Sequence, residues 1–110
     1  MERHELIKSS IDSLLLCLIG QQPMYGYQII KELEDKSHGY FKFKEGTLYP
    51  ALHRLEKTGL LTAKWETTAG GRQRRYYHIT VKGNGILAER RVQLLDYLSA
   101  MSLIIKPVSA

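Results

Sequence analysis

Apolar residues recur at helical spacing in three segments of the first sixty residues. The second segment covers about residues 26–36, and the third covers about residues 46–59 and ends at a glycine, a common helix terminator. In the third segment Thr47 is the expected N-cap, and Pro50 falls in the first turn, where its missing N–H costs little. The first segment covers about residues 9–20, and its apolar stripe consists of Ile11, Leu14, Leu15, Leu18 and Ile19.

The polarity then alternates at every second residue, which is typical of β-strands. Residues 61–67 and 74–80 are therefore predicted strands, and the glycine pair between them predicts a hairpin with its tip at about residues 68–73. We expect Trp65 to pack at the base of this hairpin. Residues 40–44 alternate aromatic and basic side chains, which predicts another short strand with its aromatic face on the core.

A final long helix is predicted from about Val81 to Ile105, with Thr80 as its N-cap and Pro107 beyond its end. Its apolar stripe has the spacing of a helix-packing seam and consists of Leu87, Leu94, Leu98, Met101 and Ile105. Further apolar residues widen this surface beyond what one small domain covers. A second copy of the chain is the expected cover, since two-fold dimers are the commonest oligomers. We therefore assign the stripe to a dimer interface, together with Leu15 and Tyr97.

The order helix, helix, helix, hairpin, long helix predicts a fold that is mainly α with a β-hairpin. Three helices followed by a hairpin are the pattern of a winged helix-turn-helix, in which the second and third helices form the turn motif and the hairpin is the wing. We assign residues 1–80 to a winged helix-turn-helix domain that binds DNA. Residues 81–110 are assigned to a C-terminal dimerisation helix.

The charge is unevenly distributed along the chain. The 110 residues carry a formal net charge of +5, and residues 62–82 alone contain five basic residues and one acidic residue. A local basic patch indicates a polyanionic partner, and double-stranded DNA is the polyanion that suits a winged helix. The competing hypothesis is a protein-interaction module that uses its basic face on an acidic protein.

The third helix and the wing supply the candidate DNA contacts. A recognition helix enters the major groove with its N-terminal residues near bases and phosphates, and arginines at a hairpin tip reach phosphates or the minor groove. Three alternatives stay open. Arg54 pairs with a carboxylate, Lys42 and Lys44 are merely solvated, or the hairpin tip is an ordinary charged turn. The candidates are Lys42, Lys44, Thr47, Tyr49, Pro50, His53, Arg54, Arg72, Gln73 and Arg74.

Three stretches have the character of motifs: residues 24–29 (MYGYQI), 45–60 (EGTLYPALHRLEKTGL) and 70–80 (GGRQRRYYHIT). Together they closely resemble the PadR family of transcriptional regulators, over about residues 11–83. The resemblance implies a dimeric winged-helix protein, usually a repressor, that binds a palindromic operator. The single C-terminal helix looks like the smaller PadR subfamily.

A small-molecule inducer of unknown identity is a further partner that the resemblance implies. Some small PadR proteins bind flat aromatic compounds at the dimer interface, using a tryptophan of the last helix. This chain departs from that pattern, because its one tryptophan is Trp65 in the wing. Tyr97 and Met101 are candidates for lining a different pocket, although dimer packing is the favoured role of both.

Other functional classes find little support. The four histidines are scattered, no His/Cys spacing resembles a zinc site, and no nucleotide-binding fingerprint occurs, so we expect neither an enzyme nor a metal or cofactor. The single cysteine, Cys17, lies in an apolar block and is expected to be a packing residue. The chain has no run of about 18 apolar residues and no signal-peptide pattern. These absences favour a cytoplasmic protein without a membrane span.

Overall fold

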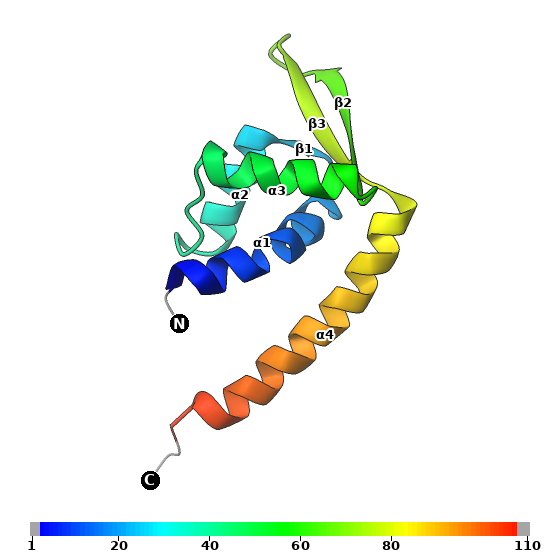
Figure 1. Cartoon of the computed structure of the whole chain (residues 1–110). Helices are drawn as coiled ribbons and strands as arrows, with labels where there is room; N and C mark the ends of the chain where they lie inside the picture. Colours follow the sequence, from blue (N-terminus) through cyan, green and yellow to red (C-terminus); the bar gives the residue numbers. More distant parts are fainter. Residues whose placement is uncertain (1–2, 108–110) are drawn as a thin grey trace.

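The computed structural model describes residues 3–107, with side chains from residue 10 onward. Within that range the chain forms four helices and three strands (Figure 1). This is the predicted mainly α architecture with a β-hairpin. In chain order the elements are α1 (Arg3–Ile19), β1 (Met24–Tyr25), α2 (Gly26–Lys36), α3 (Glu45–Lys57), β2 (Leu61–Thr67), β3 (Gln73–Ile79) and α4 (Val81–Ile105).

The helices α1, α2 and α3 enclose one apolar core. Each helix turns its apolar stripe toward its neighbours, so the periodicity that predicts the helix also defines the surface that it buries. No polar or charged side chain of residues 10–107 is buried in this core. Apolar packing is therefore the main interaction within this core. The largest fully buried side chains are Leu15, Leu16, Ile19, Met24, Ile29, Leu48, Leu52 and Leu61.

The hairpin belongs to a three-stranded antiparallel sheet with the order β1-β3-β2. In the hairpin, Leu61 pairs with Ile79, while β1 joins the other edge of β3 by pairing Met24 with Tyr77. The sequence did not predict β1, because two residues are too short a segment for an alternating pattern. This strand ties the start of α2 to the base of the wing.

The wing tip is a tight turn. The N–H of Thr68 donates to the carbonyl of Arg72 at 2.7 Å, and the N–H of Gly71 donates to the carbonyl of Thr68 at 2.9 Å. Gly71 has a φ of 84°, a left-handed conformation that glycine adopts without steric cost. This turn closes the hairpin, and the wing projects beyond the helices as a two-stranded arm (Figure 1).

The bounds predicted for the last helix agree with those of α4. Thr80 is its N-cap, as predicted, since its Oγ1 accepts a hydrogen bond from the N–H of Gly83 at 2.9 Å. The first turns of α4 pack on the domain, and the remainder extends away from it (Figure 1). The molecule is correspondingly elongated, with extents of 59 × 28 × 23 Å. No helix within residues 3–107 is long and apolar enough to cross a membrane.

Three elements have bounds that differ from the prediction. α1 begins at Arg3 instead of near Ser9, because helical hydrogen bonding propagates from an apolar nucleus into a segment that has no apolar stripe. α3 begins at Glu45 with Lys44 as its N-cap, so Thr47 lies inside the first turn and caps nothing. β3 covers residues 73–79, one residue earlier than predicted at each end.

Residues 40–44 form an irregular connector instead of the predicted strand. The N–H of Phe41 donates to the Ser37 hydroxyl at 2.9 Å, so the connector bonds back to the end of α2. The rings of Phe41 and Phe43 stack with their centroids 6.0 Å apart, and Phe43 is buried. The alternating pattern here belongs to a loop that rests its aromatic side chains on the core.

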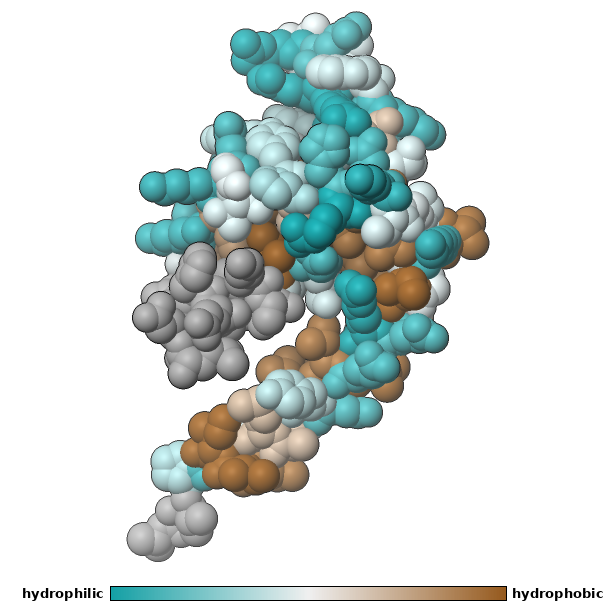
Figure 2. All heavy atoms as spheres, viewed as in Figure 1, coloured by the Kyte–Doolittle hydropathy of each residue, from teal (hydrophilic) through white to brown (hydrophobic). Residues whose placement is uncertain are grey.

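Two residues predicted for a dimer interface are buried in the chain's own core instead. Leu15 of α1 is 0% exposed and Leu87 of α4 is 4% exposed. The two helices pack against each other there, so neither side chain has surface to offer a second subunit. Figure 2 shows hydrophobic residues gathered along the extended part of α4. The remaining predicted interface residues lie on α4 and are exposed or partly exposed: Leu94, Tyr97, Leu98, Met101 and Ile105.

Candidate nucleic-acid interface

The polar face that the sequence predicts for α3 is exposed. Residues on a helix are about 100° apart, so the buried stripe leaves the opposite side to solvent. The buried side consists of Leu48, Ala51, Leu52 and Leu55. The exposed side carries Thr47, Tyr49, Pro50, His53 and Arg54.

Arg54 differs from the rest of this face, because a carboxylate compensates its charge. Its Nη2 donates to Oδ1 of Asp12 in α1 at 2.7 Å. This ion pair is the alternative that the sequence left open for Arg54. The side chain lines a hollow with Lys82 and Arg90. Its guanidinium is consequently directed to α1 and not toward the wing.

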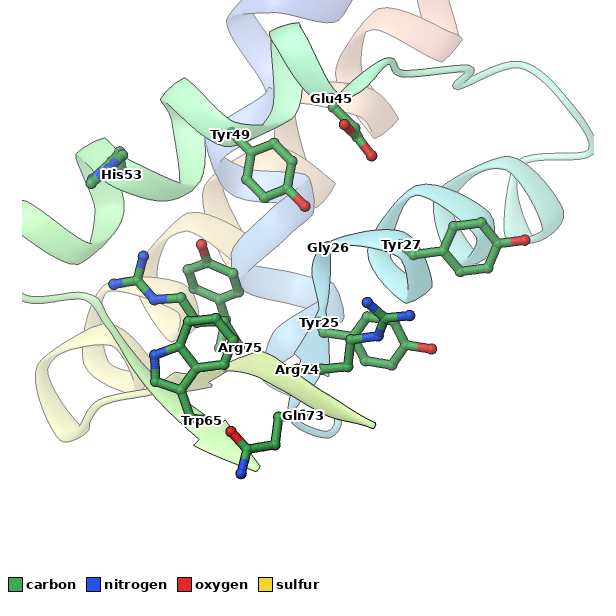
Figure 3. A pocket seen from close by; sticks show the side chains of 11 residues that line it. Tyr25, Gly26, Tyr27, Glu45, Tyr49, His53, Trp65, Gln73, Arg74 and Arg75 are labelled. Atoms are coloured by element: carbon green, nitrogen blue, oxygen red, sulfur yellow. The ribbon is translucent and has the colours of Figure 1, made fainter. Parts of the chain in front are cut away.

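A cleft of about 690 Å³ separates α3 from the wing and from the start of α2 (Figure 3). We call it the α3–wing cleft. Its aromatic and basic walls come from three parts of the chain, namely residues 25–27, α3 and the wing. β1 makes this arrangement possible, because it pairs with β3 immediately before α2 begins. The main side chains of the walls are Tyr25, Tyr27, Tyr49, His53, Trp65 and Arg74.

Tyr49 lies across the first residue of α2. Its hydroxyl and ring edge occupy the space that a β-carbon on Gly26 would fill. Gly26 is itself buried, so a glycine at this position allows the tyrosine ring to rest on the helix start. Tyr49 is thereby held at the mouth of the cleft with part of its ring in solvent.

The two arginines at the start of β3 have different environments. Arg75 donates to Oε2 of Glu56 in α3 at 2.8 Å, so a carboxylate compensates its charge. The guanidinium of Arg74 lies 5.5 Å from the centre of the Tyr25 ring and, among residues 10–107, has no carboxylate partner. One of the basic residues of the wing is therefore neutralised by an acid from α3. Arg74 rests against an aromatic ring, and Glu66, its cross-strand neighbour, hydrogen-bonds His78 instead.

Tyr77 lies at the back of the cleft. Burial raises the pKa of its hydroxyl above the ordinary value; the Arg75 guanidinium opposes this rise, and Glu56 and Tyr49 add to it. The hydroxyl is therefore neutral at physiological pH. Oε2 of Glu56 accepts the hydrogen bond from Arg75, whereas Oε1 is buried and accepts none from the described side chains or backbone.

Trp65 does not pack at the base of the hairpin as predicted. Its side chain is 70% exposed and forms part of the cleft wall (Figure 3). The alternation along β2 places it on the same side as Leu61 and Ala63. The domain ends before the strand does, so the core covers Leu61 and leaves the indole uncovered.

The cleft unites four of the predicted DNA-binding residues, namely Tyr49, His53, Gln73 and Arg74. The other six lie outside its walls: Lys42, Lys44, Thr47, Pro50, Arg54 and Arg72. No local signal marks Glu45 or Trp65 as a cleft residue. The cleft residues that were not among the predicted DNA contacts are Tyr25, Gly26, Tyr27, Glu45, Trp65, Arg75 and Tyr77. Among residues 10–107, no three His, Cys, Asp or Glu side chains converge as a metal site.

A polar helix face beside a projecting β-hairpin defines this protein as a winged-helix protein. The Transcriptional regulator PadR-like family matches residues 15–89, which is more than half of the chain. The chain therefore belongs to the PadR-like family of transcriptional regulators. Its members bind DNA and are not enzymes.

Several relatives support this assignment. The chain is 43% identical over 87 residues to the transcriptional regulator Rv3488 of Mycobacterium tuberculosis, covering 79% of this chain and 78% of that one. A transcriptional regulator structure from Clostridium thermocellum aligns with a TM-score of 0.80 at 27% identity, over 93% of this chain and 96% of its own. A PadR-like regulator from Bacillus cereus aligns with a TM-score of 0.79 at 29% identity, over 94% and 99%.

Proposed function

We propose that the protein is a homodimeric repressor that binds a palindromic operator in the cytoplasm. Residues 1–80 bind the DNA, and residues 81–110 join the two subunits. α3 enters the major groove, and the wing reaches the neighbouring backbone or minor groove. The observation that carries this proposal is the shared orientation of two surfaces. The exposed face of α3 and the basic wing border one cleft, so a single duplex can touch both.

The individual residues divide into two groups by the chemistry they offer. Tyr49 and His53 present hydrogen-bonding groups on α3 and are proposed to read bases. Arg72 and Arg74 carry charges that, among residues 10–107, no carboxylate compensates, and they are proposed to neutralise phosphates. Lys42 and Lys44 are exposed before α3 and are proposed to add backbone contacts, as are Thr47, Pro50 and Gln73. Arg54 contributes only after it leaves Asp12.

The extended part of α4 supports the homodimer. Its apolar side chains include Leu103 and Ile104, and the latter is 86% exposed. A contiguous apolar surface of this kind favours association, and a second copy buries it symmetrically. Two recognition helices of such a dimer reach half-sites about 34–36 Å apart, one turn of DNA. The operator is therefore expected to be palindromic.

Selection of bound DNA from a random pool tests this proposal. The expected result is an inverted repeat with half-sites about one turn apart, bound at least about 10³-fold more tightly than a scrambled duplex. Its affinity should fall steeply with salt, because bound phosphates release counterions. Equal affinity for all sequences would contradict the proposal of a sequence-specific repressor. Loss of all DNA binding would favour the alternative, a module that binds an acidic protein.

Variants of the two groups sharpen this experiment. Arg72→Ala should weaken binding to every sequence and reduce the salt slope by about one, whereas His53→Ala should alter base preference. Lys106→Ala removes a charge from the far end of α4 and serves as the control. It should change neither quantity. An Arg72→Ala variant with the wild-type salt slope would exclude the wing from the interface.

A further inference from the structure

Trp65 has an unusual position for the largest apolar side chain of the protein. It is the single tryptophan of the sequence, and its indole is 70% exposed on the cleft side of β2. It is remote from the extended part of α4, since the wing and that helix end project in different directions (Figure 1). A second subunit on α4 therefore leaves Trp65 uncovered. Tryptophan gains much from burial and is enriched at interfaces, so its exposure here indicates a partner in the cleft.

The position of the cleft indicates what crosses it. In the proposed complex α3 occupies the major groove and the wing reaches the adjoining minor groove. One sugar–phosphate strand separates these two grooves, so it must pass between α3 and the wing. The α3–wing cleft is the space between these elements, with Trp65 on one wall and Tyr49 and His53 on the other (Figure 3).

The charges in the cleft agree with such a strand. Arg75 is bound to Glu56 and has no charge to spare. Arg74 begins on the face of the hairpin opposite Trp65, has no carboxylate partner among residues 10–107, and reaches the cleft beside the Tyr25 ring. One phosphate can thus meet a preplaced cation. A deoxyribose elsewhere on the same strand is apolar on its exposed edge and matches the flat indole. Bases in a duplex remain stacked, so the sugar and not the base is the surface available to Trp65.

We propose that Trp65 is a DNA-contact residue: its indole packs on a deoxyribose of the strand that crosses the α3–wing cleft, and Arg74 binds a phosphate of the same strand. The inference rests on the proposed function and adds a contact that reads no sequence. It therefore supports affinity for operator and scrambled DNA alike, and it positions α3 in the groove.

Tryptophan fluorescence of the wild-type protein gives the first test. Trp65 is the only tryptophan, so selective excitation reports on the cleft without interference from the seven tyrosines. Titration with the selected operator should shift its emission to shorter wavelength and protect it from quenching by iodide. Anisotropy of a labelled duplex follows binding independently. If the duplex binds while the Trp65 emission and quenching stay constant, the inference is overturned. If the duplex does not bind at all, the proposed function fails and the inference fails with it.

Substitution gives the second test. Trp65→Ala should weaken binding to operator and scrambled DNA by a similar factor, about tenfold for one well-packed aromatic contact. Trp65→Phe keeps a flat ring and should recover most of this loss. Thr62→Ala changes an exposed residue on the opposite face of the same strand and should bind as the wild type. Because the indole is exposed, thermal unfolding of all three variants should resemble the wild type. Wild-type affinity in Trp65→Ala would overturn the inference.

Discussion

The absence of a side chain at Gly26 leaves the space in which the Tyr49 ring lies. A β-carbon at position 26 would meet the hydroxyl and ring edge of Tyr49, which lie at the far end of a side chain that can rotate. Gly26→Ala should therefore turn the Tyr49 ring away at little cost to stability. Alanine even suits a helix better than glycine.

The expected outcome for Gly26→Ala is weaker operator binding with nearly unchanged thermal unfolding. A double-mutant cycle with Tyr49→Ala separates the two effects, since coupled neighbours are non-additive. In the Tyr49→Ala background, Gly26→Ala should cause no further loss of affinity. Additive losses would mean that Gly26 acts independently of the ring.

Tyr77 predicts a dependence of stability on alkaline pH. Burial is the main cause that raises the pKa of its hydroxyl in the folded state above the value of 10.0. The stabilisation from the neutral hydroxyl is therefore complete below about pH 10 and is lost as the pH rises through the folded-state pKa. Tyr77→Phe removes this ionisation. Urea unfolding at about pH 8 and about pH 11 should show a smaller loss of stability in the variant than in the wild type. Equal losses would mean that ionisation of Tyr77 does not cause the alkaline loss of stability.

At the level of elements, α4 begins with two glycines that have opposite roles. A β-carbon on Gly83 would collide with the carbonyl oxygen of Leu60 and meet Cγ1 of Ile79 at 2.8 Å. The backbone of Leu60 cannot rotate away as a side chain does. Gly83 thus lets the start of α4 pack directly on the start of the wing. Gly85, in the same helix turn, has nothing within 4 Å of its missing β-carbon.

The matched substitutions should change stability in opposite directions. Gly83→Ala should lower the free energy of unfolding by about 1–3 kcal/mol, because the junction is overpacked. Gly85→Ala should raise it by about 0.5–1 kcal/mol, since alanine loses less backbone entropy in a helix. Chemical denaturation of both variants measures the pair. A stabilised Gly83→Ala protein would show that the junction is looser than described.

At the level of the whole molecule, the exposed stripe of α4 predicts a dimer. The mass measured by light scattering at micromolar concentration should be about 25 kDa, twice the 12.6 kDa of one chain. Leu98→Asp places a charge on the apolar side and should give a monomer with much weaker operator binding. Gln93→Asp places the same charge on an exposed polar position, about 140° around the helix from Leu98, and should remain dimeric. A wild-type mass near 12.6 kDa would refute the dimer.

Most of the fold could be predicted from local periodicity in the sequence. The bounds of α2, β2 and α4 and the N-cap Thr80 were predictable, because helix and strand periods and capping chemistry depend on residues within a few positions of each other. The exposed face of α3 was predictable for the same reason. β1 and the connector at residues 40–44 were not, because a two-residue strand has no period and an alternating loop imitates one.

By itself, the sequence determined the elements, their order and the polar side of α3, which was enough to predict a winged helix. Only the tertiary structure decided how the charges are paired, since Arg54 meets Asp12 across 42 positions and Arg75 meets Glu56 across 19. Only it decided that Leu15 and Leu87 are internal and that Trp65 is exposed. Periodicity indicates which residues share a face, but whether that face is buried depends on which other elements of the chain pack against it.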